Sequence, residues 1–183
     1  NFKVPSNELV NVSLHHDAQG IVCQTQFQKD IYDLNLNLPE KTLSFSGNLW
    51  STQSLDLLET YSPKEKNNKC AIIDSPYPQK GTQASVDFCK EKKWEFDLIK
   101  DPDYNSFLDK LSEYSKLVFH PFTPETCCRV VLEAKMMNLE IETNHLVGAS
   151  YEEWYSKKGI DLINLMREKR DNFTEFLRPL IHG

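Results

Sequence analysis

The sequence has little glycine and no excess of positive charge, and each shortage narrows the possible functions. Only 6 of the 183 residues are glycine, and the Gly-x-x-x-x-Gly-Lys spacing of a P-loop is missing. The formal net charge of −6 disfavours broad contact with nucleic acid or an anionic membrane, although it leaves room for a small basic pocket. No apolar run approaches the roughly 20 residues of a membrane-spanning helix, so no transmembrane segment is expected.

The cysteines are few and scattered, and none forms a Cys-x-x-Cys pair. There are 5 of them, an odd number, which is typical of reduced and buried thiols and favours a cytoplasmic protein. The cluster His15-His16-Asp17 is a poor metal site, because adjacent residues chelate badly and no further ligands stand at a finger spacing. We therefore expect no metal. The content of 39% hydrophobic and 26% charged residues is typical of a globular domain.

What the sequence does contain is an alternation of short apolar runs with amphipathic segments. The runs predict strands over residues 20–25, 41–46, 70–74, 96–99, 117–120 and 139–143. The amphipathic segments predict helices over residues 25–34, 55–61, 82–92, 105–114, 123–137 and 151–180, the last broken near Gly159. This order favours a doubly wound α/β fold with a parallel sheet and right-handed crossovers. The polar run at 62–69 predicts a linker, which divides the chain into domains at 1–62 and 63–183.

In such a sheet, ligands bind at the carboxyl ends of the strands, and the loop after the strand at 70–74 has suitable residues. Lys80, Gly81 and Thr82 place a cation, a glycine and a hydroxyl at the start of a helix. Free backbone N–H groups and the helix dipole favour an anion such as phosphate at this position. A proline-rich surface turn with a solvated lysine is the simpler interpretation of the same residues.

The loop after the strand at 117–120 is the second candidate. His120 lies at the strand end, where it either contacts a ligand or is an ordinary satisfied polar residue. Thr123-Pro124-Glu125 has the cap, proline and acid that favour a helix start. Glu125, Arg129 and Glu133 follow at four-residue spacing on one face of this predicted helix, which indicates either a ladder of surface ion pairs or a polar stripe toward a cleft.

The segment from Pro121 to Lys135, with its two glutamates eight residues apart and Arg-Val-Val-Leu-Glu-Ala-Lys, resembles the signature of retaining glycosyltransferases of the GT-B fold. The resemblance covers about residues 65 to 183 and implies a Rossmann-like carboxyl-terminal domain, with residues 15 to 62 as a remnant of the amino-terminal domain. It implies that Glu133 binds the ribose of the nucleotide and that Glu125 faces the donor sugar. Lys80-Gly81 resembles the pair that lies against the diphosphate in this family.

Two functions follow from these patterns. The first is a glycosyltransferase donor-binding domain that takes a UDP- or GDP-sugar as substrate, transfers the sugar to an unknown acceptor, and requires no cofactor because Lys80 and Arg129 neutralise the leaving diphosphate. The alternative is a Rossmann-like module that binds a nucleotide or a protein without catalysis. No nucleic-acid partner is expected, and a homo-oligomer remains open. The catalytic candidates are Lys80 and Glu125, and the donor-binding candidates are Lys80, Gly81, Thr82, His120, Thr126, Arg129 and Glu133.

Overall fold

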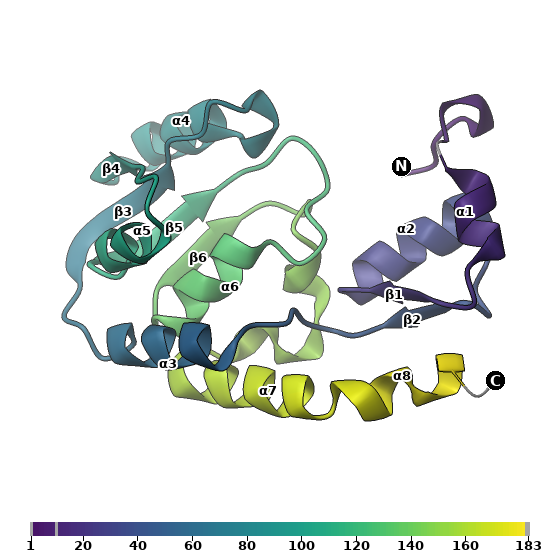
Figure 1. The fold of residues 1–183 in the computed structure, drawn as a ribbon. Coiled ribbons are helices and arrows are strands. Elements are labelled where there is room, and N and C mark those ends of the chain that lie inside the picture. Colours follow the sequence, from purple (N-terminus) through teal and green to yellow (C-terminus); the bar gives the residue numbers. More distant parts are fainter. Residues whose placement is uncertain (1, 10, 182–183) are drawn as a thin grey trace.

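A computed structural model describes residues 2–9 and 11–181 and shows an α/β protein with two parallel sheets. The larger lobe contains a four-stranded sheet in the order β4-β3-β5-β6, and the smaller lobe contains the pair β1-β2 (Figure 1). The predicted α/β class with parallel strands is therefore confirmed.

Most elements follow the predicted alternation, with three differences: the helix Val12–Asp17 was not predicted, a strand begins at Asn67 within the predicted linker 62–69, and the first part of the predicted helix 151–180 forms 3-10 turns. The strands are β1 Ile21–Cys23, β2 Thr42–Ser44, β3 Asn67–Ile73, β4 Phe96–Ile99, β5 Tyr114–Phe119 and β6 Glu140–Thr143. The helices are α1 Val12–Asp17, α2 Gln26–Leu36, α3 Thr52–Tyr61, α4 Thr82–Lys92, α5 Tyr104–Leu111, α6 Arg129–Met136, α7 Gly159–Asp171 and α8 Phe173–Ile181. Short 3-10 turns lie at Ser6–Glu8, Pro78–Lys80, Gly148–Tyr151 and Glu153–Ser156.

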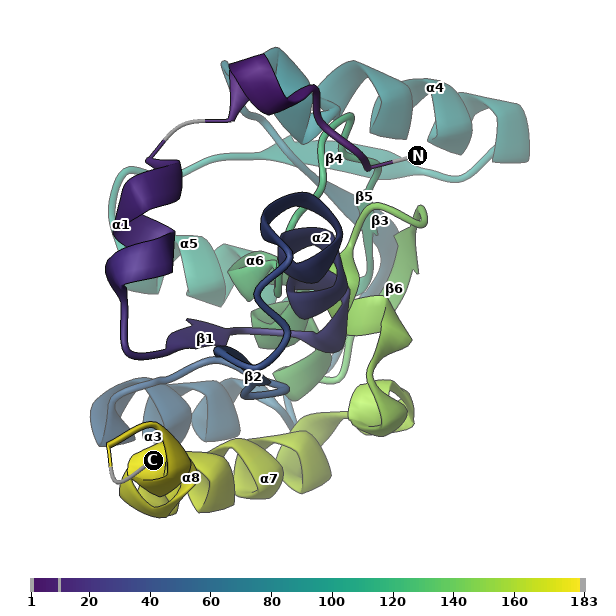
Figure 2. The ribbon, with the colours of Figure 1, turned by 90° about the vertical axis from the view of Figure 1, so that its right-hand side faces the viewer.

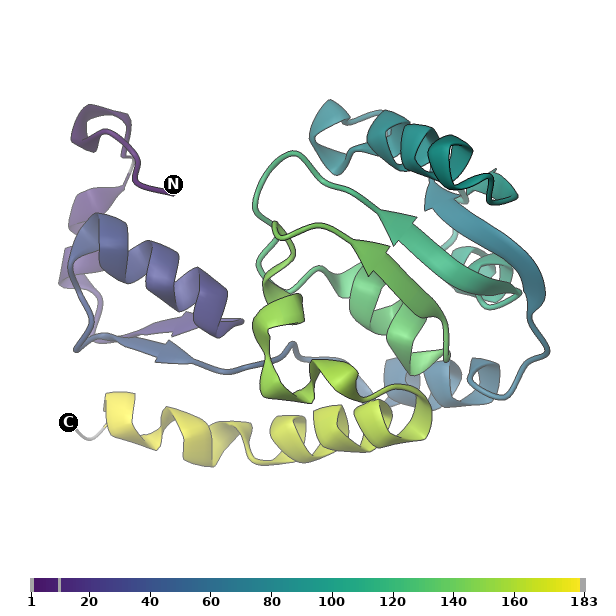
Figure 3. The same ribbon diagram turned by 180° about the vertical axis from the view of Figure 1, so that it is seen from behind.

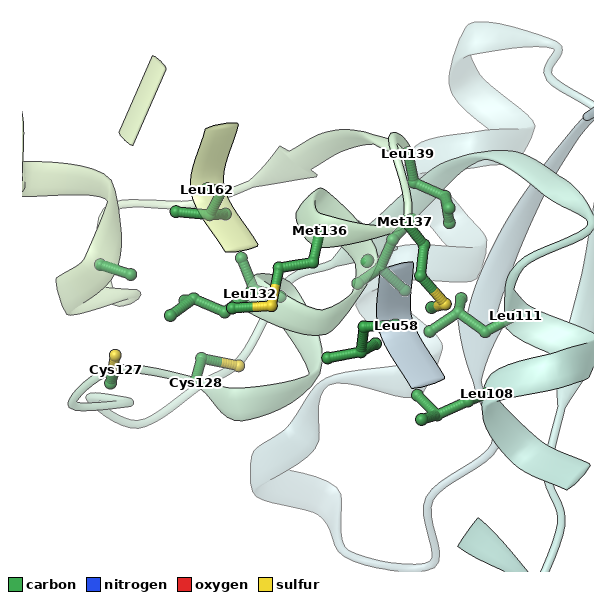
Figure 4. Close-up of a cluster of buried hydrophobic side chains, with 14 of the residues drawn as sticks. Leu58, Leu108, Leu111, Cys127, Cys128, Leu132, Met136, Met137, Leu139 and Leu162 are labelled. Atoms are coloured by element: carbon green, nitrogen blue, oxygen red, sulfur yellow. The ribbon is translucent and has the colours of Figure 1, made fainter. Parts of the chain in front are cut away.

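Helices cover both faces of the four-stranded sheet. Because side chains alternate along a strand, Cys70 and Ile72 of β3 face α4, whereas Ala71 faces the opposite side, where α5 and α6 pack. On that second side α3 and α7 complete the main core, so helix α3 packs with the larger lobe. Figure 4 shows this core, which includes Leu58, Leu108, Leu111, Leu132, Met136, Met137, Leu139 and Leu162.

The carboxyl-terminal helices extend along both lobes. Helix α7 packs against α3 and α6, and α8 continues beneath β1 and β2 (Figures 1 and 2). The ring of Phe45, just after β2, makes edge contacts at 5.1 Å with Phe173 and 5.3 Å with Phe176. These helices therefore connect the smaller lobe to the larger one. Among the helices of the described residues, none is long and apolar enough to cross a membrane.

The helix predicted from Thr123 begins six residues later, at Arg129, so the predicted start is wrong. The backbone of Glu125 is extended and forms a parallel bridge with Val147. Its N–H donates to the carbonyl of Leu146, and its carbonyl accepts from Gly148, each over 2.8 Å. This pairing with a distant segment satisfies the backbone groups that a helix would otherwise use, and it overrides the local signals of a cap and a proline.

Candidate functional site

The carboxyl ends of the four parallel strands lie at one edge of the larger sheet, and the loop after β5 extends from this edge toward the smaller lobe (Figure 3). The loops after β3 and β5 are in direct contact there, since the N–H of Phe122 donates to the carbonyl of Gln79 over 2.9 Å. The edge therefore brings together the two loops that carry most of the candidate residues.

Lys80 and Glu125 meet between these loops. The Lys80 Nζ lies 2.6 Å from Glu125 Oε1, and the side chains are 39% and 17% exposed, respectively. A lysine and a carboxylate at this distance form a charge-assisted hydrogen bond. The two predicted catalytic residues are thus neighbours in space, at a position that is still accessible from solvent.

Gly81 allows this close approach of the loops. Its φ is +68°, and a Cβ at this position would lie 1.8 Å from the carbonyl oxygen of His120. The next residue, Thr82, uses its hydroxyl within the turn, where it donates to the carbonyl of Ile73 over 2.8 Å and accepts from the N–H of Ser75. No side chain of the described residues caps the N-terminus of α4, so the first N–H groups of the helix have no side-chain partner there.

Glu133 is 2% exposed and has two partners on one oxygen. Its Oε1 accepts the hydroxyl of Tyr104 over 2.5 Å and the Nε of Arg129 over 2.7 Å. Among the described residues, Oε2 has no hydrogen-bond partner. Burial and the Glu133 carboxylate raise the pKa of Tyr104 to about 12, so this hydroxyl keeps its proton and remains a donor at neutral pH.

Arg129 packs beside aromatic rings as well as beside its acid. Its guanidinium carbon lies 5.5 Å from the centre of the Trp50 ring and 5.8 Å from that of Tyr104. Burial opposes its charge, but the hydrogen bonds to Glu133 and Tyr104 outweigh burial and raise the pKa of Arg129. The predicted stripe in which Arg129 lies between two acids on one helix is wrong, because Glu125 precedes the helix.

Two residues of this cluster were missed by the sequence analysis. Tyr104 begins α5, shortly after the carboxyl end of β4, and Trp50 lies in the segment before α3. Because ligands bind beyond strand ends, the position of Tyr104 after β4 is the signal in the sequence that points to it. No local pattern indicates Trp50, since tertiary packing alone brings it to Arg129.

His120 and Thr126 face different surroundings from the Lys80–Glu125 pair. The His120 ring packs edge-on against Phe88 at 4.6 Å, and its Nε2 lies 3.8 Å from Glu142, too far for a hydrogen bond. Thr126 faces the smaller lobe, where its hydroxyl donates to the side chain of Gln24 and its carbonyl accepts from Thr25 over 3.0 Å.

Within residues 2–9 and 11–181, no group of three or more histidine, cysteine, aspartate or glutamate side chains is arranged to hold a metal ion. The five cysteines are free and buried. No protein-family model matches the chain, and no curated protein sequence matches it significantly. The geometry of the sheet edge is therefore the basis for a functional assignment.

Proposed function

We propose that the chain is the donor-binding domain of a glycosyltransferase of the GT-B type and that a nucleotide diphosphate sugar binds at the carboxyl edge of its larger sheet. Under this proposal the four-stranded sheet with helices on both faces is a Rossmann-like domain. The observation that carries the proposal is the contact of Lys80 with Glu125, at the uncapped N-terminus of α4.

The diphosphate is assigned to Lys80 and the first turn of α4. Backbone N–H groups at a helix start attract phosphate, and a lysine beside them adds a full positive charge. In the structure that lysine is held by Glu125. A bound diphosphate would compete for the Lys80 ammonium and leave the Glu125 carboxylate facing the sugar.

The ribose is assigned to Glu133. Tyr104 and Arg129 both bond to Oε1 and fix the orientation of the carboxylate, so Oε2 can accept a hydrogen bond from a hydroxyl group. The centres of the Trp50 and Tyr104 rings lie 5.5 Å and 5.8 Å, respectively, from the Arg129 guanidinium. This arrangement preorganises a carboxylate, which reduces the cost of ordering it on binding.

In the proposed reaction an acceptor hydroxyl oxygen forms a bond to the anomeric carbon of the sugar. The bond between that carbon and the diphosphate oxygen breaks, and the diphosphate departs with the electron pair. The hydroxyl proton passes to the departing phosphate oxygen. Lys80 and the α4 N-terminus would stabilise the negative charge that develops on the diphosphate, which is the main electrostatic contribution available at this site.

Isothermal titration of the full chain with UDP, GDP and their sugar conjugates tests the proposal. We expect Lys80→Ala and Glu133→Gln each to weaken nucleotide binding by about tenfold or more, since each removes a charged hydrogen-bond partner. Lys64→Ala and Glu59→Gln are matched controls, because these side chains form ion pairs elsewhere, with Asp109 and Arg167, respectively.

Absence of binding by every nucleotide in the wild-type chain would contradict the proposal. Binding that Glu133→Gln leaves unchanged would instead contradict the assignment of the ribose. Nucleotide binding without any release or transfer of sugar would favour a non-catalytic module.

A further inference from the structure

A cavity of about 490 Å³ lies between one face of α2 and the 3-10 turn that ends at Tyr151. Phe2, Phe27 and Tyr151 supply its aromatic walls. Ile31 and Leu34 of α2 add aliphatic side chains. None of the described residues that line it is assigned to the nucleotide sugar, so this cavity is a second candidate site with its own chemistry.

The aromatic walls of the cavity are held in place by one another. The Phe2 and Phe27 rings meet at 5.2 Å with an interplanar angle of 85°, and Phe27 stacks on Tyr151 at 5.3 Å with an angle of 2°. The hydroxyl of Tyr151 donates to the carbonyl of His145 over 3.0 Å, which fixes the outer ring. Tyr151 is still 55% exposed, so part of its ring is open to a ligand.

Among the described residues that line the cavity, Asp30 alone is charged. Its Oδ1 accepts the side-chain amide of Gln26 over 2.7 Å, which orients the carboxylate. No lysine, arginine or histidine of the described residues forms an ion pair with it, whereas Asp33, three residues later, is paired with Lys29. The cavity therefore combines aromatic rings with a carboxylate whose charge is not neutralised by an ion pair.

A second carboxylate lies at the same end of α2. The positive end of the helix dipole would disfavour a cation there. Glu152, which is 9% exposed, accepts the backbone N–H of Gln26 over 2.8 Å and offsets this positive charge. The ammonium of Lys3 donates to the carbonyl of Leu34 and does not line this cavity. The electrostatics near Asp30 thus favour a cationic ligand.

The free polar groups are too few for a primary ammonium. The Tyr151 hydroxyl and the Gln26 amide already donate to protein acceptors, so an ammonium with three N–H groups would lose more hydrogen bonds to water than it regains. A trimethylammonium group has no N–H and is attracted by the negative faces of aromatic rings. Rings beside one carboxylate therefore favour a quaternary ammonium.

We propose that this cavity binds the trimethylammonium group of a choline-type ligand, with the methyl groups against the Tyr151 ring and the positive charge beside Asp30. The proposal goes beyond the transferase function and does not depend on it, because the two sites share no residue.

Isothermal titration of the full chain compares choline chloride with 3,3-dimethyl-1-butanol, a neutral isostere in which carbon replaces the nitrogen. We expect choline to bind about fivefold more tightly or better, because only choline gains from the rings and the carboxylate. Asp30→Asn and Tyr151→Leu are each expected to weaken choline binding about fivefold. Tyr151→Phe keeps the ring and is expected to bind choline as the wild type does.

Two matched controls lie outside the cavity. Asp17→Asn removes an exposed carboxylate of the smaller lobe, and Tyr77→Leu removes a tyrosine that is 61% exposed. Both are expected to leave choline binding unchanged, and urea unfolding checks that all variants are folded. Co-sedimentation with phosphatidylcholine vesicles then assigns the site to a lipid headgroup if the chain pellets, and to free choline-type ligands if it does not.

Three results would overturn the proposal. The first is no binding of choline by the wild type, and the second is equal affinity for choline and the neutral isostere. The third is choline binding that Asp30→Asn leaves unchanged. Loss of nucleotide binding together with intact choline binding would reject the transferase function and leave the ammonium site standing.

Discussion

The His120 ring directly follows β5 and is half-buried, with its side chain 14% exposed, between a phenyl ring and a carboxylate. Its Nε2 atom has no hydrogen-bond partner among the described residues, and Glu142 lies 3.8 Å away. Burial lowers the pKa of His120 below its usual 6.5, and the nearby Glu142 carboxylate only partly opposes this shift. The ring is therefore neutral in the folded protein under conditions in which an exposed histidine begins to take up a proton.

This lowered pKa predicts a loss of stability in mild acid. Below pH 6.5 the unfolded chain binds a proton at His120 that the folded chain does not bind, so the free energy of unfolding falls as the pH falls. Well above pH 6.5 the ring is neutral in both the folded and the unfolded chain, so this loss of stability is absent. We expect the wild type to lose more stability than His120→Gln between about pH 7.5 and about pH 5.5, measured by urea unfolding.

The carboxylates with lowered pKa values do not disturb this comparison. Asp33, Asp101, Asp103 and Glu140 have pKa values below their usual 3.8 or 4.5, so they lose their stabilising charge only in stronger acid. An equal loss of stability in wild type and His120→Gln would show that the buried ring is not the source.

At the scale of elements, the carboxyl end of α4 is followed by a residue with a strained backbone. Helix α4 ends at Lys92, and the following residue, Lys93, has a φ of +56° in the left-handed region. The N–H of Trp94 then donates back to the carbonyl of Cys89 over 2.9 Å. A left-handed residue after a helix is usually glycine, because a side chain costs free energy in this conformation.

The strain at Lys93 predicts that two glycine substitutions only three residues apart have opposite effects. Lys93→Gly relieves the left-handed backbone and is expected to raise the free energy of unfolding by about 1 kcal/mol. Lys90→Gly lies within α4 and is expected to lower it by about 1 kcal/mol, because glycine is a poor helix former. Both residues are exposed, so chemical denaturation of the two variants measures the backbone alone. Effects of the same sign would contradict this account.

The elements that the sequence analysis predicted best are those with local signals at both ends. The helix at 82–92 and the strand at 96–99 have the observed bounds, since Gly81 and the polar run around Lys93 mark where α4 starts and stops. The helix start at Thr123 was wrong because Glu125 pairs with Val147, 22 residues later, and no local pattern contains that contact.

The sequence indicates which loops carry the candidate residues, but it does not indicate most of their contacts. The rule for strand ends identified both loops, and the structure joins them through Lys80 and Glu125. The helical spacing correctly paired Arg129 with Glu133 as an i,i+4 ion pair. The contact of Tyr104 with Glu133 spans 29 residues and depends on the strand order, which the sequence pattern alone did not specify.

At the scale of the whole molecule, a buried carboxylate connects the two lobes. Glu152 is 9% exposed, and its Oε1 accepts the N–H of Gln26 at the start of α2 over 2.8 Å. Its other oxygen accepts the hydroxyl of Ser46, and the carbonyl of Ser46 accepts the indole N–H of Trp154 over 2.8 Å. These hydrogen bonds, which are largely shielded from water, are one of the connections between the smaller lobe and the segment that carries Glu152.

Removal of this carboxylate is expected to destabilise the protein. Glu152→Ala leaves the Gln26 N–H and the Ser46 hydroxyl without their acceptor, which costs roughly 1–3 kcal/mol. In Glu152→Ala, the increase in hydrogen-exchange rate relative to the wild type should be larger in β1 and α2 than in the four-stranded sheet. Glu153→Ala is the matched control, since the adjacent Glu153 is exposed. Equal stability of the two variants would mean that the lobes are held together by other contacts.

The continuation of α7 into α8 has a consequence for the order of folding. The smaller lobe consists of two stretches of chain, residues 2–46 and 173–181, separated by the whole of the larger lobe. During synthesis, residues 50–171 emerge before α8 and can fold as a unit, while Phe45 still lacks Phe173 and Phe176. Until α8 has been synthesised, Phe45 lacks both of these aromatic partners, and we expect the nascent chain to be more prone to aggregation or to binding by chaperones during this interval.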